Sequence, residues 1–451
     1  MKKSTKLIIL LVVMVLAVGG YLLLKLLPGE TEVIDVDKSV YVPTVDQDSI
    51  TGVEYTSLDQ EIKISKDGEN WSWTGDPDFP LDQTYPQSIV SSLANITASR
   101  LVVESTEDEA QYGFDSPKFE FKLTKKDQSV FSIFVGDYNS VSDGYYLKVQ
   151  DNKAIYLVAS TFVETFNHEK LDMMVADELS SVDSTSVKSV TVNSGDKTCV
   201  LTTDKSVADF YSEPYTYFYI DGENKAIPAG AVPATNLVSA AAAVDFNSAA
   251  FFAPSEDELA KLGTLESKMS VKVVYEEAVE NEAEDTSVSV MTEKTKEFEI
   301  GKYIDENGTA AYYANLPGSQ KIYSVLNSKG TAMFESISAD MSSNLVAPVL
   351  KDDTAKMSVE YNGSTFDHSF PSDSDDVNSL FEKITTLVCT EKNVKESGKR
   401  VMKCTFTLNS EENYTLEIYE NGGDGYVCAF DKFSGMKISG ESFDAVKALI
   451  K

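Results

Sequence analysis

The chain carries an internal repeat, which constrains its fold more than any other feature of the sequence. Two stretches share one order of expected elements: an aromatic segment, a helix, a glycine-containing loop, two strands, a Tyr-Tyr strand, another strand and a short helix. Gly113 and Gly263, in the matching loops, are 150 positions apart, whereas Gly136 and Gly301, at the matching strand ends, are 165 apart. We attribute the difference to an acidic insertion around 276–285 in the second stretch.

The periodicity of the segments predicts an α+β protein. Phe119, Phe121 and Leu123 alternate with Glu120 and Lys122, which is typical of antiparallel strands with one covered and one solvated face. A third, shorter unit shows the same order near the C-terminus. We therefore expect tandem repeated modules of antiparallel sheet covered by helices, after one N-terminal transmembrane helix. The expected helices are 87–100, 161–167, 234–244, 330–336, 377–387 and 442–450, and the expected strands are 118–124, 130–135, 154–158, 269–275, 296–300, 321–325, 401–408 and 414–419.

An apolar run without charge, Leu7–Leu24, precedes the repeated part. Its length approaches the thickness of a bilayer core, and the lysines before it indicate a cytoplasmic N-terminus. We expect residues 7–27 to anchor the chain in the bacterial cytoplasmic membrane, with the bulk of the chain outside. A cleaved signal peptide is the alternative. The expected divisions are 1–28 for the cytoplasmic tip and anchor, 29–48 for an acidic stalk, 49–176 for the first module, 177–345 for the second and 346–451 for the third.

Charge and composition narrow the function classes. The chain has 39 Lys and Arg against 72 Asp and Glu, a formal net charge of −33, which repels nucleic acid and excludes it as a partner. His168 and His368 fall in different modules, and no Gly-x-Ser-x-Gly elbow is present, so we name no catalytic residue. Acid clusters near Asp76 and Asp375 lack the spacing of an EF-hand, and we assign no metal or cofactor. Acids in turns are the favoured interpretation of these clusters, and loose calcium binding is the alternative.

Two sets of residues each allow two interpretations. Cys404 and Cys428 lie on one side of predicted strands, either as cross-strand neighbours able to pair or, as we favour, as buried free thiols. Tyr215, Tyr217 and Tyr219 form a candidate interaction surface, because tyrosine combines an apolar body with a polar tip. Packing within a half-buried strand is the favoured interpretation of these tyrosines.

A series of short motifs resembles a known family. A Trp-x-Trp element at 71–73 is followed by Tyr-Gly-Phe-Asp-x-Pro at 112–117, Val-Gly-Asp at 135–137, Tyr-Tyr at 145–146 and Ile-Tyr-Leu-Val at 155–158. This order resembles the bacterial family called domain of unknown function 4340, over about residues 50–340. We expect the motif glycines to serve turns. The resemblance implies membrane-anchored extracytoplasmic proteins encoded beside ATP-driven transporter subunits, and it attaches no catalytic residues.

These observations lead to one expected function and two alternatives. We expect a non-enzymatic, single-pass, membrane-anchored extracytoplasmic scaffold or binding protein. The family resemblance alone implies that it is accessory to an ABC-type transporter and contacts its permease subunits. The first alternative is a glycan- or peptidoglycan-binding module that uses the tyrosines. The second is an extracytoplasmic hydrolase, which requires a deep pocket with convergent carboxylates or a lysine of displaced pKa.

Overall fold

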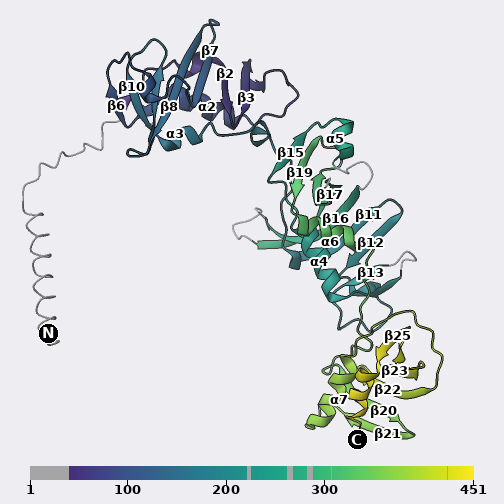
Figure 1. Ribbon diagram of the computed structural model, residues 1–451. Coiled ribbons are helices and arrows are strands. Elements are labelled where there is room, and N and C mark those ends of the chain that lie inside the picture. The colour runs from purple at the N-terminus through teal and green to yellow at the C-terminus, as the bar shows by residue number, and fades with distance from the viewer. Residues whose placement is uncertain are drawn as a thin grey trace, which may run out of the picture. The chain divides into compact units, whose positions relative to one another are not determined.

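The structure, a computed structural model (Figure 1), describes residues 40–220, 225–261, 268–281, 288–305, 307–423 and 425–450. Within these ranges the protein is α+β, as predicted, and consists mainly of antiparallel sheets with helices packed on them. Two compact units divide between Val175 and Ala176. The predicted anchor, residues 7–27, lies outside the described ranges, and no helix within them is long and apolar enough to cross a bilayer.

The first unit contains an eight-stranded antiparallel sheet and a small strand pair. The predicted alternation holds in this sheet, since Phe119, Phe121 and Leu123 are buried and Glu120 is exposed. The elements are β1 (Val40–Tyr41), β2 (Ile50–Ser57), β3 (Gln60–Asp67), β4 (Asn70–Trp73), α2 (Thr84–Ala94), β5 (Thr97–Ala98), β6 (Arg100–Val103), β7 (Phe119–Lys125), β8 (Val130–Asn139), β9 (Gly144–Val149), β10 (Ile155–Ala159) and α3 (Ser160–Glu164). The strand order is β4-β3-β2-β7-β8-β9-β10-β6, and β1 pairs with β5.

The second unit begins with a nine-stranded antiparallel sheet. Helices α4 and α6 pack against each other, and both contact this sheet. The elements are β11 (Val187–Ser194), β12 (Lys197–Thr202), β13 (Phe218–Ile220), β14 (Ala226–Pro228), α4 (Ala231–Ala242), β15 (Ala249–Phe252), α5 (Glu256–Lys261), β16 (Met269–Asn281), β17 (Val288–Ile304), β18 (Ala310–Asn315), β19 (Lys321–Val325) and α6 (Asn327–Ser336). The strand order is β14-β13-β12-β11-β16-β17-β18-β19-β15.

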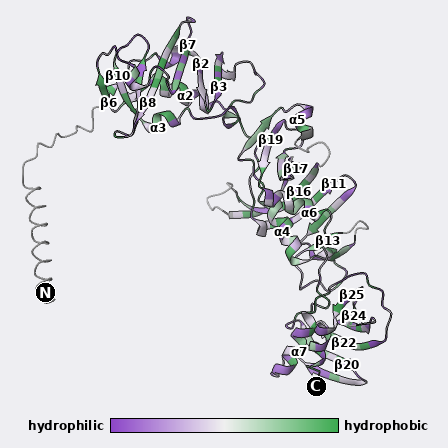
Figure 2. Cartoon of the chain, viewed as in Figure 1, coloured by the Kyte–Doolittle hydropathy of each residue, from purple (hydrophilic) through white to green (hydrophobic). Residues whose placement is uncertain are grey.

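The second unit also contains a six-stranded antiparallel sheet with its own core. Met402, Cys404, Phe406 and Leu408 of one strand are buried, as the alternation predicted. Figure 2 shows hydrophobic and hydrophilic residues interleaved along the strands. The elements are β20 (Thr354–Tyr361), β21 (Ser364–Ser369), α7 (Asp375–Thr385), β22 (Arg400–Leu408), β23 (Asn413–Glu420), β24 (Gly425–Phe430), β25 (Phe433–Ser439) and α8 (Gly440–Lys447). The strand order is β21-β20-β22-β23-β24-β25.

One strand order recurs in all three sheets. The strands β3-β2-β7-β8-β9-β10-β6 of the first sheet have counterparts in β12-β11-β16-β17-β18-β19-β15 of the second. The third sheet repeats six of these positions, from β21 to β25. The segment after α7 occupies the seventh, because the Thr390 amide donates to Lys437 O at 2.7 Å and the Lys437 amide donates to Glu391 O at 2.8 Å. This recurrence matches the order of elements seen in the sequence.

The helix predicted over 87–100 is shorter than expected. It forms α2, which ends at Ala94, and the residues Arg100–Val103 form β6, which pairs with β10. Consecutive valines at 102 and 103 suit a strand. The neighbouring edge of β10, which sequence periodicity does not reveal, decides their conformation.

The predicted stalk is wrong for residues 40–48, which belong to the first folded unit. There β1 pairs with β5, and Val42 is buried. The Thr44 hydroxyl donates to Ala94 O at 2.5 Å. The acidic average of 29–48 hid the short apolar stretch Val40–Val42, which docks on the unit.

Two further expectations need correction. The acidic insertion at 276–285 does not lie wholly between the strands predicted over 269–275 and 296–300, since β16 continues to Asn281 and β17 starts at Val288. Cys404 and Cys428 are buried free thiols, as favoured. They are not cross-strand neighbours, because β23 lies between β22 and β24.

Candidate functional site

The predicted interaction surface is a half-buried segment rather than an exposed one. Tyr219 lies in β13, and Tyr215 and Tyr217 lie just before it; all three are of intermediate exposure. The Tyr215 ring meets Phe210 and Phe218 edge-on, with ring centroids 6.3 and 6.5 Å apart. Burial raises the pKa of Tyr215. The segment therefore contributes to packing, as the favoured interpretation held.

Tyr215 also lines a hollow of about 330 Å³ within the second unit. The hollow brings it together with Pro228 of β14, Lys392 of the segment after α7, and Phe433 of β25. Phe433 packs edge-on against Phe210, at 5.1 Å between centroids. Aromatic and aliphatic walls beside polar groups are the ordinary composition of a small-ligand site.

Each of the two lysines that line this hollow, Lys392 and Lys432, forms an ion pair with an aspartate. Lys392 Nζ lies 2.8 Å from Asp340 Oδ2 and donates to Ser342 O at 3.0 Å. Lys432 Nζ lies 2.7 Å from Asp209 Oδ2. Burial alone would raise the pKa of Asp340, but hydrogen bonds from Lys392 and Ser342 outweigh it and lower the pKa. The hollow therefore offers paired charges and aromatic surface, which suit binding and orientation of a ligand.

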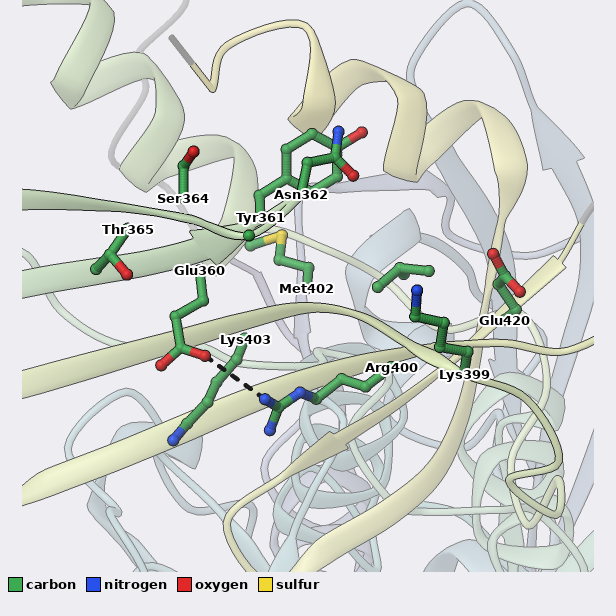
Figure 3. A pocket seen from close by; sticks show the side chains of 12 residues that line it. Glu360, Tyr361, Asn362, Ser364, Thr365, Lys399, Arg400, Met402, Lys403 and Glu420 are labelled. Atoms are coloured by element: carbon green, nitrogen blue, oxygen red, sulfur yellow. Dashed lines mark ion pairs between the residues drawn. The ribbon is translucent and has the colours of Figure 1, made fainter.

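A second hollow, of about 590 Å³, lies at one end of the third sheet (Figure 3). Figure 3 shows Glu360 directed towards Arg400, and the two side chains are 3.5 Å apart. Arg400 also lies 2.5 Å from Glu417, and this hydrogen bond raises the pKa of Arg400. Lys399 and Lys403 add positive charge at the same place, and Glu420 adds negative charge. The surface is therefore an ion-paired one of mixed sign.

Sequence reasoning missed a buried lysine in β17. Lys296 is 5% exposed, and its Nζ donates to the carbonyls of Ser180 at 2.9 Å, Ala242 at 3.0 Å and Val244. Burial lowers its pKa to about 8, against the opposing attraction of Asp245. Ala242 is the last residue of α4 and Val244 lies two residues beyond it, so the lysine caps the C-terminal end of that helix.

Lys296 bears on the hydrolase hypothesis, which called for a lysine of displaced pKa. An ammonium group has three N–H donors, and here each has a main-chain acceptor. A sequence signal for this lysine exists, because the alternation places it on the face that Phe298 and Ile300 bury. A lysine at a core position of a strand indicates buried acceptors for its ammonium group.

The remaining candidate residues lie apart from one another. The His168 ring packs edge-on against Tyr85 at 5.0 Å, and His368 lies in β21 of the other unit. Asp76 pairs with Lys170 at 2.6 Å, and Asp375 lies in the first turn of α7. Across the described ranges, no group of three or more His, Cys, Asp or Glu side chains is arranged to hold a metal ion.

The two family motifs of the first unit meet in space. Gly113 has φ of 82°, which a non-glycine residue adopts only with strain, and it ends the short 3-10 helix Ala110–Tyr112. Gly136 was expected in a turn but lies inside β8, where an added Cβ would be 2.1 Å from Tyr112 O. The glycine of the second motif therefore lets the backbone of the first approach β8 closely. We interpret the motif pair as structural.

Comparison with known proteins finds a match in the part of the chain that contains these motifs. No match was found among curated proteins or among solved structures. A family model described as "Domain of unknown function (DUF4340)" matches residues 71–209. The match begins at the Trp-x-Trp element, includes both glycine motifs and ends before the tyrosine segment, so it is narrower than the expected range of 50–340. Residues 71–209 therefore match the DUF4340 family, which the motifs of this segment indicated.

Proposed function

We propose that the chain is a non-enzymatic binding scaffold, anchored by residues 7–27 in the bacterial cytoplasmic membrane with its N-terminus inside. The modules following the anchor are extracytoplasmic and are accessory to an ABC-type transporter, with permease subunits as direct partners. The observation that carries the proposal is the recurrence of one strand order in three sheets of one chain. Tandem copies of one module offer several similar surfaces in series, an arrangement common in binding scaffolds.

The solvent-facing sides of the sheets support this proposal. Charged residues of neighbouring strands pair across each of them, as Lys63 does with Glu54, Lys272 with Glu297, and Arg400 with Glu360. Such exposed pairs contribute little to stability, of the order of 0 to 1 kcal/mol each. Their main effect is to keep a sheet face soluble and polar, with the charge pattern open to a partner.

The experiment is purification from intact membranes. The full chain, tagged after Lys451, is solubilised in mild detergent and recovered, and co-purifying proteins are identified by mass spectrometry. We expect a permease and its ATPase in fixed ratio to the chain. Recovery of the chain alone, without a permease, refutes the transporter link.

Membrane topology is tested separately, by protease treatment of intact cells. We expect cleavage of the tagged chain from outside, and full protection refutes the extracytoplasmic assignment. A version whose residues 1–28 are replaced by a cleavable signal peptide serves as the control, because it reaches the same compartment without an anchor.

Glycan binding is the second candidate, favoured by the partly exposed Tyr215, Tyr217 and Tyr219, of which Tyr215 lines the aromatic hollow. The intact chain is mixed with purified cell walls and sedimented. Tyr217→Ala is the preferred variant, because Tyr215 packs against two phenylalanine rings and its loss would disturb folding. We expect at least a tenfold loss of sedimentation with Tyr217→Ala and none with Tyr41→Ala, an exposed tyrosine of the first unit. Equal sedimentation of both variants refutes this candidate.

A further inference from the structure

Strands β16 and β17 extend beyond the sheet that they help to build. They face each other from Met269–Ile300 out to Asn281–Val288. The outer neighbour of β16 is β11, whose pairing stops at Tyr275, and the outer neighbour of β17 is β18, whose pairing starts at Glu299. Within the described ranges, residues 276–281 and 288–293 therefore form main-chain strand pairs only with each other. We call these twelve residues the ribbon; it continues from the strands labelled β16 and β17 in Figure 1.

The other two sheets show that a sheet of this order does not require a ribbon. The equivalent hairpin β7–β8 has six facing pairs and closes after Thr124–Val130. The hairpin β22–β23 has seven and closes after Thr407–Asn413, whereas β16–β17 has thirteen. A two-stranded ribbon without a covering layer is marginally stable in water. The extension of the second sheet therefore adds surface that its own core does not use.

The ribbon exposes apolar side chains on both faces. Val279 and Val290 are cross-strand partners, 39% and 48% exposed, on the side that continues the buried face of the sheet. Met291, 58% exposed, lies on the opposite side. Exposed acids flank them, among them Glu277 and Glu293. Apolar groups surrounded by a charged rim are the usual composition of a protein-binding surface.

The charge of the ribbon and of the whole chain indicates the kind of partner that the ribbon can bind. The twelve residues of the ribbon include four acids and no basic residue, and the whole chain has a net charge of −33. Lys188 and Lys294, outside the ribbon, pair with Glu276 and Glu277 at its base. A second copy of the chain would be repelled, whereas a basic surface would be attracted. We propose that the ribbon is a docking arm for a partner protein whose receiving surface has a basic rim around an apolar groove. The proposal rests on the scaffold function and names the surface through which one partner is held.

The test places a photo-crosslinking amino acid at Val290 of the full chain in intact cells. The matched control carries it at Val141, which is 95% exposed and lies in the first unit. Adducts are purified by the tag and identified by mass spectrometry. We expect a discrete adduct at Val290 with a protein of basic surface, no such adduct at Val141, and at least a fivefold loss of adduct when Glu293→Lys is added.

In the crosslinking experiment, three results overturn the proposal: no adduct above the Val141 level, an adduct only with a second copy, or an adduct unaffected by Glu293→Lys. A trimmed variant, with residues 277–292 replaced by Asn-Gly, tests a purely structural role. We expect its unfolding midpoint in urea to equal that of the wild type, and a large loss of stability refutes the arm. If permease co-purification persists while no adduct forms at Val290, the arm is wrong and the scaffold stands. If the wild-type chain is recovered without a permease, the transporter link is refuted instead.

Discussion

Replacing Lys296 by methionine tests how a buried charge is accommodated in the second unit. The side chain is 5% exposed, and its Nζ donates to three main-chain carbonyls, two of them at the end of α4 and the third on Ser180. Methionine keeps a similar length and removes both the charge and the donors. A comparison of the two proteins across pH isolates the contribution of this one ammonium group.

The sign of the pH effect follows from the direction of the pKa shift. The pKa of Lys296 is about 8 in the folded protein, against an ordinary 10.5. Between these values the unfolded chain holds a proton that the folded chain lacks, so the free energy of unfolding rises with pH. The contribution is complete above pH 10.5 and is lost as the pH falls through 8. From pH 7 to pH 9.5 the wild type should gain about 2 kcal/mol relative to Lys296→Met.

The assay must report on the second unit. Tryptophan fluorescence does not, because both tryptophans, Trp71 and Trp73, lie in β4 of the first unit. We suggest pulsed hydrogen exchange in urea, with peptides from α4 as the probe. Lys294→Met is the matched control: Lys294 is half exposed, and its hydrogen bond to Glu277 raises its pKa.

We expect the wild type to gain stability relative to Lys296→Met as the pH rises, and the stability of the wild type relative to Lys294→Met to stay level. A level difference for Lys296→Met would refute the reasoning. It would mean that the three carbonyls hold the ammonium as strongly as water does.

Three other outcomes are expected. Gly136→Ala should lower the stability of the first unit by about 1 to 3 kcal/mol, because its Cβ would lie 2.1 Å from Tyr112 O; tryptophan fluorescence in urea measures this, and an unchanged midpoint contradicts it. A thiol reagent at pH 8 should label none of the four cysteines before denaturation and all four after it. The thiols are buried and free, and burial raises the pKa of Cys199 to about 11. Labelling of only two thiols after denaturation would indicate a disulfide. Tyr211→Phe should cost about 1 to 3 kcal/mol in the second unit, because it removes a 2.6 Å hydrogen bond to Asp353; hydrogen exchange there measures the change, and unaltered exchange speaks against it.

Local sequence signals were sufficient for much of the fold. Strand 321–325 was predicted with its observed bounds, and 401–408 to within one residue, because alternation along a strand is a property of adjacent residues. The order of elements in the repeat could also be predicted, since each module contains strands and helices in the same order along the sequence. Packing was the favoured interpretation of the tyrosine segment, because aromatic residues are common in half-buried strands.

Other features depended on contacts between residues distant in the sequence. Arg100–Val103 became a strand because the edge of β10 was available, and Cys404 and Cys428 are separated by β23. Lys296 found its carbonyls at the end of a helix more than 50 residues away. The apolar face of each strand can be read from the sequence, because it depends on a two-residue period. The neighbours of each strand, the extension of β16 and β17 beyond their sheet and the acceptors of the buried Lys296 come from the three-dimensional fold, because they depend on pairings that no local period encodes.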